Sequence, residues 1–134
     1  MSLLLLFAWA FAAATILPVS SEVALGLAMA GGSDWRVAVI VATVGNVLGA
    51  CTTYGLARLA ITAAPAPGPR VRRASEWLAR FGAPALLLSW VPLIGDILVA
   101  VAGAARVPLA PAIAWMTIGK AARYVAVALT LRRF

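Results

Sequence analysis

Four ionisable side chains interrupt the apolar stretches of this sequence. Glu22 and Asp96 each follow a proline by four residues, and Lys120 and Arg123 lie three residues apart in the last apolar stretch. Acidic and basic groups that share an apolar environment can neutralise each other, which is the least costly way to keep either group there. We therefore expect the four side chains to line one cavity. Burial there favours the protonated carboxylic acids, whereas a helix dipole or a cation favours the carboxylates.

The chemistry expected of such a cavity is transport. One cysteine and no histidine exclude a zinc site of the Cys/His type, histidine-ligated haem and catalytic triads built on histidine. We predict no enzyme activity, no catalytic residue, no metal and no cofactor. Intramembrane carboxyl groups suit proton carriage, and cations near helix N-termini suit an anionic headgroup.

The composition is that of a membrane protein. Of 134 residues, 64% are hydrophobic and 11% are charged, and the mean hydropathy is +1.02. A soluble domain carries about 25% charged residues. Residues 37–57 contain no charge, over a length close to the roughly 20 residues that span a hydrocarbon core. We predict an all-α integral membrane protein.

The formal net charge of +7 is explained by topology. Five of the arginines lie in the connection 58–80, which holds one acid. Residues 71–81 alternate with helical periodicity, apolar on one face and charged on the other, which predicts an amphipathic helix on the membrane surface. The positive-inside rule places this connection in the cytoplasm, and we predict no nucleic-acid partner.

The N-terminal apolar stretch, residues 3–17, is predicted to be the first span. A secretory signal peptide is the rival interpretation, but a signal peptide needs a basic N-terminal region and no Lys or Arg precedes Arg36. We expect this span to end near Leu17, with the N-terminus in the cytoplasm. Trp35, beside charged residues, is predicted to be an interface anchor.

Two short patterns recur at a fixed offset of 74 residues. One is a proline followed four residues later by a carboxylate, and the other is a threonine followed two residues later by glycine and then by a polar residue. They are Pro18 to Glu22 with Pro92 to Asp96, and Thr43 to Asn46 with Thr117 to Lys120. We predict a single membrane domain, 1–134, built by duplication. Repeat 1 covers about 1–57, the cytoplasmic amphipathic connection 58–81, and repeat 2 about 82–134.

The stretches that follow Pro18 and Pro92 are too short to cross a bilayer as helices and are predicted to be re-entrant half-helices. One helix lies between the two insertions, so the repeats are expected to be inverted. Such broken segments mark a transporter whose site lies between the halves at the membrane midplane. The predicted substrate and proton pathway consists of Glu22, Asp96, Lys120, Arg123 and Asn46, and the re-entrant turns contain Pro18, Ser21, Pro92 and Gly95.

Gly45 and Gly49 form a GxxxG spacing in the span 37–57. In membranes this spacing usually allows two helices to pack closely, within one chain or between chains. We predict that Gly45 and Gly49 are packing residues, and this face together with the small size of the chain is the basis for considering a homodimer.

Several segments together resemble the YqaA-like branch of the DedA family, also described by its VTT domain. They are PVSSEVAL, TVGNVLGACTTYGLAR, LLLSWVPLIGDIL, AGAARV and IGKAARYVAVA. The resemblance implies a multi-pass protein of the bacterial inner (plasma) membrane, with two re-entrant helices that face each other. It also implies membrane lipids as partners, because eukaryotic relatives scramble phospholipids and some bacterial members are implicated in returning undecaprenyl phosphate across the membrane with the proton-motive force.

The resemblance carries over to single residues in part. Glu22 matches the acid after the proline of the family's first re-entrant segment. Two functional arginines of the second re-entrant segment are absent, since Trp90 and Asp96 stand near their places. Lys120 and Arg123, on the next helix, are expected to supply this positive charge.

We therefore predict a membrane transporter, a proton-coupled flippase or scramblase of a lipid-linked anion such as undecaprenyl phosphate or a phospholipid. Two alternatives stay open. One is a transporter or channel for a small ion or solute, and the other is a membrane-organising protein without transport activity. Intramembrane charges argue against the second alternative, because they are costly to keep without a function.

Overall fold

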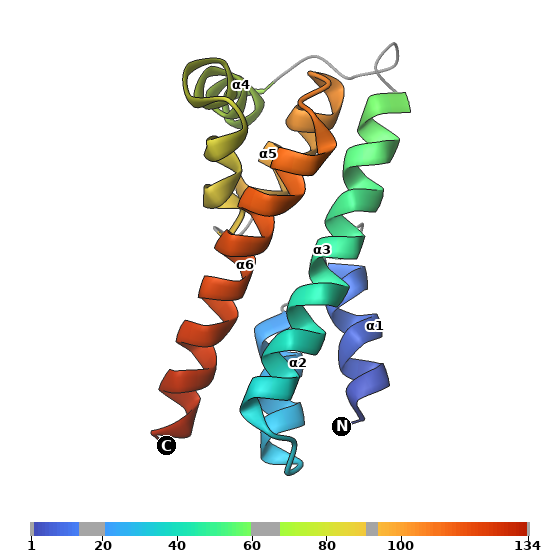
Figure 1. The fold of residues 1–134 in the computed structure, drawn as a ribbon, viewed down its shortest axis with the longest axis vertical. Helices are drawn as coiled ribbons and strands as arrows, with labels where there is room; N and C mark the ends of the chain where they lie inside the picture. Colours follow the sequence, from blue (N-terminus) through green and yellow to red (C-terminus); the bar gives the residue numbers. More distant parts are fainter. Residues whose placement is uncertain (1, 14–20, 60–67, 91–93, 134) are drawn as a thin grey trace. The chain divides into compact units, whose positions relative to one another are not determined.

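The computed structural model describes residues 2–13, 21–59, 68–90 and 94–133, and within these segments all regular structure is helical (Figure 1). The expectation of an all-α protein is confirmed for this part of the chain. The helices in chain order are α1 (Leu3–Ala13), α2 (Ser21–Ala30), α3 (Trp35–Leu59), α4 (Pro69–Phe81), the 3₁₀-helix η1 (Ala83–Trp90), α5 (Ile94–Ala104) and α6 (Leu109–Arg132).

Two of these helices are long and apolar enough to cross a membrane. They are α3, with 25 residues, and α6, with 24 residues, and their most apolar windows have mean hydropathies of 1.6 and 1.2. At 1.5 Å per residue each is about 36 Å long, slightly more than the roughly 30 Å of a hydrocarbon core. They match the predicted stretch 37–57 and the last apolar stretch of the sequence, which contains Lys120 and Arg123.

The chain forms two compact units, and each contains one part of α3 and one part of α6. Unit 1 consists of Met1–Gly49 and Lys120–Phe134, and unit 2 of Ala50–Gly119. The division differs from that of the two repeats, because the long helices of both repeats contribute to both units.

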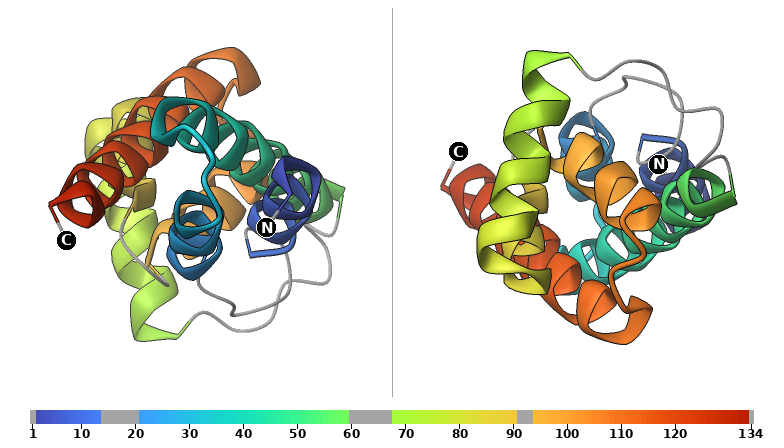
Figure 2. Two further views of the ribbon diagram at one scale, coloured as in Figure 1. Left: turned by 90° about the horizontal axis from the view of Figure 1, so that it is seen from below. Right: turned by 90° about the horizontal axis from the view of Figure 1, so that it is seen from above.

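In unit 1, α1 packs beside α2, and the two helices run in opposite directions (Figures 1 and 2). The first residues of α1 therefore lie at the end of the unit where α3 begins. The described part of the expected first span is α1, which has 11 residues and a length of about 16 Å. Residues 14–17 of the expected span, and Pro18, lie outside the described residues.

The core of unit 1 is built largely of small side chains, which allow the helices to approach closely. Ala10 of α1, Ala24 and Ala28 of α2, and Ala42 of α3 are all fully buried. Tyr124 of α6 is the largest fully buried side chain. Residues of α1, α2, the first part of α3 and the second part of α6 share this core.

The turns that end α2 and α5 are built by the same hydrogen bonds, 74 residues apart. In each turn, the N–H of a residue with positive φ donates a hydrogen bond to the carbonyl three residues earlier. The N–H of the next residue donates to the carbonyl five residues before it. The bonds are Gly32 to Met29, Ser33 to Ala28, Arg106 to Gly103 and Val107 to Ala102, with φ of 98° at Gly32 and 59° at Arg106. The helices that follow also begin 74 residues apart, at Trp35 and Leu109. The backbone therefore follows the offset predicted from the sequence motifs.

In unit 2, the predicted amphipathic helix is present as α4. Pro69 occupies its first turn, where no backbone N–H is needed, and Gly82 ends it with φ of 69° and an N–H bond to the Leu78 carbonyl at 2.8 Å. Its buried face contains Ala74 and Leu78. Its exposed face carries Arg72, Arg73, Glu76 and Arg80. The helix packs against η1 and α5.

Candidate functional site

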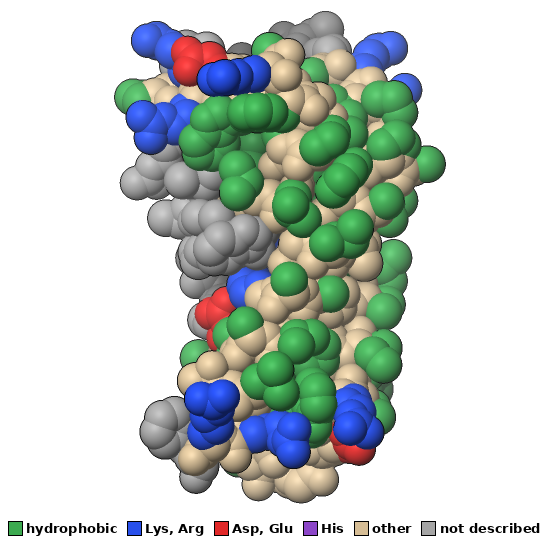
Figure 3. Space-filling model, turned by 60° about the vertical axis from the view of Figure 1, so that its left-hand side comes forward, with side chains coloured by type: hydrophobic (Ala, Val, Ile, Leu, Met, Phe, Trp, Pro, Cys, Tyr) green, Lys and Arg blue, Asp and Glu red, His purple; other side chains and the backbone are tan. Residues whose placement is uncertain are grey.

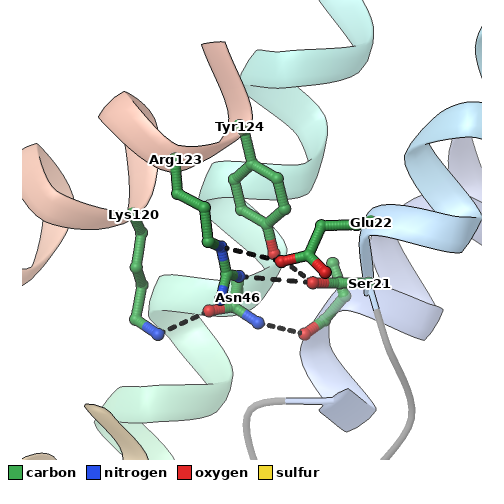
Figure 4. A network of polar contacts seen from close by, with 7 residues as sticks. Ser21, Glu22, Asn46, Lys120, Arg123 and Tyr124 are labelled. Carbon is green, nitrogen blue, oxygen red and sulfur yellow. Dashed lines mark hydrogen bonds and ion pairs between the residues drawn. The ribbon is translucent and has the colours of Figure 1, made fainter. Parts of the chain in front are cut away.

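Unit 1 gathers a network of polar side chains from α2, α3 and α6 (Figure 4). Its labelled members are Ser21, Glu22, Asn46, Lys120, Arg123 and Tyr124. Four of the five residues predicted for the substrate and proton pathway are thus brought together in one unit, namely Glu22, Asn46, Lys120 and Arg123.

One part of the network fixes a buried lysine. Lys120 is 1% exposed, and its Nζ donates a hydrogen bond of 2.6 Å to Oδ1 of Asn46, which is 3% exposed. The Asn46 amide nitrogen donates in turn to the carbonyl oxygen of Ala10 at 2.9 Å. Asn46 therefore uses its acceptor for α6 and its donor for α1, and it links three helices.

Lys120 and Asn46 are also the equivalent positions of the two sequence repeats. A second contact gives the helix directions: the Arg132 guanidinium lies 5.1 Å from the Trp35 ring centroid. Because residue 35 meets residue 132 and residue 46 meets residue 120, these parts of α3 and α6 run antiparallel.

The other part of the network is a partly exposed ion pair between Arg123 and Glu22. Arg123 Nε lies 3.4 Å from Glu22 Oε1, and the two side chains are 15% and 34% exposed. A second guanidinium nitrogen of Arg123 donates to Ser21 Oγ at 3.3 Å. Ser21 Oγ is also hydrogen-bonded to the Tyr124 hydroxyl at 2.5 Å. Partly exposed ion pairs contribute little to stability, so stability alone does not explain this cluster.

The local sequence explains why these groups meet. Ser21 and Glu22 are the first residues of α2, where free N–H groups and the helix dipole favour a carboxylate. Lys120, Arg123 and Tyr124 have the spacing i, i+3, i+4 and therefore share one face of α6. This spacing was the sequence signal for Tyr124, which was not among the predicted site residues. Nothing in the sequence pointed to the Ala10 carbonyl, because it is a backbone atom.

The depth of the network, counted from the end of unit 1 where α3 begins, can be estimated along three helices. The network lies at the first turn of α2, which is about 14 Å long, and eleven residues or about 16 Å along α3 from Trp35. On α6, Lys120 is twelve residues or about 18 Å from Arg132. All three lengths are close to half of the roughly 30 Å of a hydrocarbon core.

Thr43 adds a buried hydroxyl one helical turn before Asn46. It is 7% exposed, and its Oγ1 has no hydrogen-bond partner among the described residues. A buried hydroxyl without a partner costs free energy, so it is a donor or acceptor available to water or a ligand. The sequence motif singled out this threonine only as part of the repeat.

The remaining predicted pathway residue, Asp96, lies in α5 of unit 2, and its side chain is outside the described part. Gly95 is buried in the same helix, and Pro92 lies outside the described residues. The shared cavity expected for Asp96 and the other three charges stays a prediction.

Gly45 packs against α1 within the same chain. A Cβ atom at this position would lie 2.7 Å from the Phe7 carbonyl oxygen and 3.3 Å from the Ala10 Cβ, which is closer than such atoms approach. Gly49 on the same helix is also buried. Because α1 occupies the face at Gly45, a homodimer has to use another surface.

Comparison with known proteins agrees with this architecture. The model of the VTT domain matches residues 17–133. The chain belongs to the VTT-domain family, also called the DedA family. It is 44% identical over 133 residues to Inner membrane protein YqaA of Escherichia coli, covering 96% of this chain and 89% of that protein. Inner membrane protein YqaA of Shigella flexneri matches equally, and an uncharacterized protein of Haemophilus influenzae is 40% identical over 93% of this chain and 84% of its own length. No solved structure matches the chain.

Membership of the VTT-domain family, with relatives named as inner membrane proteins, makes this chain a membrane protein. Two of the helices that carry the polar network, α3 and α6, are long and apolar enough to cross a membrane. In that setting a charge at the bilayer centre costs about 2.5 to 3.5 kcal/mol on the insertion scale, which makes the network of Glu22, Lys120 and Arg123 the candidate functional site.

Proposed function

We propose that this VTT-domain protein transports a lipid-linked anion, such as undecaprenyl phosphate or a phospholipid, across the bacterial inner membrane and couples this movement to protons. The observation that carries the proposal is the Glu22–Arg123 ion pair beside buried Lys120, halfway along the helices of unit 1. It supplies two cations for a phosphate and one carboxyl group for a proton at the depth of the midplane.

The proposed topology follows from helix lengths and directions. Helices α3 and α6 cross the membrane in opposite directions, and α1 with α2 forms a re-entrant hairpin that enters from the side where α3 begins. In the sequence, α5 precedes α6 just as α2 precedes α3. Because α6 runs antiparallel to α3, α5 is proposed to enter the membrane from the opposite side. The two repeats are then inverted, as in many secondary transporters.

The basic residues orient this arrangement. Arg58 lies in the last turn of α3, the arginines of α4 follow it in the sequence, and Arg106 precedes α6. Arg106 is next to Val107, whose carbonyl accepts a hydrogen bond from the Tyr54 hydroxyl. The residues next to the start of α3 and at the end of α6 include three arginines, Arg36, Arg132 and Arg133, and one acid, Asp34. The positive-inside rule then puts the 58–80 connection in the cytoplasm. In this proposal the start of α1 lies on the outer side, which differs from the cytoplasmic N-terminus expected from the sequence.

The same atoms provide a mechanism for coupling. When Glu22 is ionised, its carboxylate occupies Arg123 and repels a phosphate. When Glu22 takes up a proton, the ion pair is lost, and the guanidinium can make bidentate hydrogen bonds to a phosphate that also meets Lys120 and the N–H groups at the start of α2. Release of the phosphate restores the pair and returns the proton on the other side.

The repeat makes this ion pair specific to one state. Exchange of the two halves maps the Lys120–Asn46 pair onto itself, so this contact persists in both orientations of an inverted-repeat transporter. At the 74-residue offset, the position equivalent to Glu22 is Asp96 and the position equivalent to Arg123 is Gly49. Glycine has no side chain that could form the ion pair. The ion pair is therefore specific to one orientation, and in the other orientation the Arg123 guanidinium can contact the substrate in place of Glu22.

The test is lipid translocation in proteoliposomes with a fluorescent lipid phosphate, at several pH values on the donor side. We expect translocation to rise as that side is acidified. Glu22→Gln should lose this pH response and Arg123→Gln should lose translocation. Arg72→Gln, on the exposed face of α4, is the matched control and should behave as wild type.

Two outcomes overturn the proposal. If no lipid moves at any pH but the liposomes conduct a small ion, the protein is an ion transporter or channel. If neither lipid nor ion moves and the folded protein binds both, the interpretation as a membrane-organising protein replaces transport.

A further inference from the structure

The end of unit 1 where α3 begins carries a second group of cations, far from the network at mid-depth. The guanidinium of Arg36 lies 5.5 Å from the centroid of the Trp35 ring, and that of Arg132 lies 5.1 Å from the same centroid. The arginines come from different helices, α3 and α6, and both are exposed. One indole ring thus holds two guanidinium groups at the membrane surface.

These arginines lack an acidic partner. Within the described part of the chain neither guanidinium forms an ion pair with a carboxylate, and Asp34 Oδ1 accepts the backbone N–H of Arg36 at 2.8 Å. Two like charges over one ring repel each other. An anion between or beside them would remove this repulsion, and the flat guanidinium group is weakly hydrated and suited to bidentate contact with phosphate.

An apolar stripe leads away from the two arginines along the outside of α3. Val37, Ile40 and Val44 have the spacing i, i+3, i+7 and are 43%, 61% and 46% exposed. Figure 3 shows Lys and Arg side chains gathered at the lower edge, directly below a field of hydrophobic side chains. A headgroup at the arginines therefore places its acyl chains on exposed apolar side chains.

We propose that Trp35, Arg36 and Arg132 form a binding site for the phosphodiester of an anionic glycerophospholipid in the leaflet where α3 begins. The two guanidinium groups bind the phosphate, the Trp35 ring lies at the level of the headgroups and holds both arginines, and the stripe from Val37 to Val44 receives an acyl chain. The anionic class follows from the two cations, since Asp34, an acid close to them in the described part of the chain, accepts a hydrogen bond from the α3 backbone.

The site is separate from the proposed transport pathway. It lies about 16 Å along α3 from Asn46, and neither of its arginines contacts a member of the network in the described structure. Binding here requires no translocation, so a failure of this proposal and a failure of the transport proposal are distinguishable.

The experiment uses the full chain purified in detergent, with phosphatidylglycerol and phosphatidylcholine of the same acyl chains as probes. Native mass spectrometry measures bound lipid, and thermal melting measures the stabilisation that it produces. The test variant is Arg36→Gln with Arg132→Gln. The matched control is Arg72→Gln with Arg73→Gln, which removes two exposed arginines from α4.

We expect phosphatidylglycerol to bind and to raise the melting temperature, and phosphatidylcholine to do neither. The test variant should bind phosphatidylglycerol at least tenfold more weakly, because each lost charged hydrogen bond accounts for about a factor of ten. The control should bind as wild type. The double variant Arg36→Lys with Arg132→Lys keeps both positive charges but lacks the planar guanidinium groups, and it should bind phosphatidylglycerol at an intermediate level.

The proposal is wrong if the test variant retains phosphatidylglycerol like wild type, or if the control loses as much binding, which would indicate a general charge effect. Equal binding of both lipids also overturns it. Should the double variant not fold, Arg132→Gln alone, at the last turn of α6, decides the question by the same comparison.

Discussion

The link between Lys120, Asn46 and Ala10 allows a prediction in which two substitutions break the same hydrogen bond with different results. Asn46→Leu removes the acceptor of the Lys120 ammonium and the donor to the Ala10 carbonyl, whereas Lys120→Met removes the ammonium itself. We expect Asn46→Leu to destabilise the protein strongly and Lys120→Met to leave its stability nearly unchanged.

The magnitudes follow from burial and charge. A hydrogen bond to a charged donor contributes about 1.5 to 3 kcal/mol and a neutral one about 0.5 to 1.5 kcal/mol. Asn46→Leu should therefore lower the free energy of unfolding by about 2 to 4 kcal/mol. Lys120→Met loses the charged bond, but it also removes a cation whose insertion at mid-depth costs about 2.5 to 3.5 kcal/mol. Its net effect should stay within about 1 kcal/mol.

The assay is equilibrium unfolding in bicelles by steric trapping, applied to wild type, both single variants and the double variant. In the double variant the Lys120 ammonium is absent together with its Asn46 acceptor, so this variant should be more stable than Asn46→Leu alone, with a coupling energy of about 2 kcal/mol. Lipid translocation, measured in parallel, should fall in both single variants.

Two results would refute this reasoning. One is a Lys120→Met variant as unstable as Asn46→Leu, which would mean that the amine stabilises the fold. The other is a double variant whose loss equals the sum of the single losses, which would mean that the two side chains do not interact.

Further predictions concern glycines and turns, and thermal melting of the purified protein checks each of them. Gly45→Ala should cost about 1 to 3 kcal/mol, because its Cβ would lie 2.7 Å from the Phe7 carbonyl oxygen, whereas Gly55→Ala has no atom within 4 Å and should stabilise α3 by up to about 1 kcal/mol. Equal melting temperatures for the two variants would contradict the packing of α1 on α3. Gly32→Ala should cost about 1 kcal/mol, because φ is 98° and the space around it is open, so that only backbone strain acts. Arg106→Gly, at the equivalent turn with φ of 59°, should leave the stability unchanged or raise it, and a loss above about 1 kcal/mol would indicate a contact of this arginine rather than strain.

Local properties of the sequence determined most of the secondary structure. Hydropathy located the two long helices, helical periodicity located α4, and Pro69 and Gly82 mark its ends. The 74-residue offset predicted from two motifs reappears in the hydrogen bonds of both turns. These features could be predicted because each depends on a residue and its neighbours within a few turns of helix.

The path of the N-terminal segment could not be predicted in this way. Residues 3–17 have the composition of a span, but α1 lies antiparallel to α2 and begins at the end of unit 1 where α3 begins. Composition gives the affinity of a segment for lipid, and it does not tell a crossing helix from one arm of a hairpin. The contact of Phe7 and Ala10 with Gly45 shows that α1 packs on α3, and it removes the argument for a dimer through that glycine.

From the residue types alone, Glu22, Asn46, Lys120 and Arg123 could be identified as polar groups within apolar stretches and therefore as candidates for function. Their partners depend on the fold: Lys120 contacts Asn46, Arg123 contacts Glu22 and Ser21, and Asn46 contacts a backbone carbonyl of α1. A charge in an apolar environment needs a partner, but several pairings satisfy that requirement equally well in the sequence. The antiparallel packing of α3 on α6 and the close approach of α1 at Gly45 select one of them.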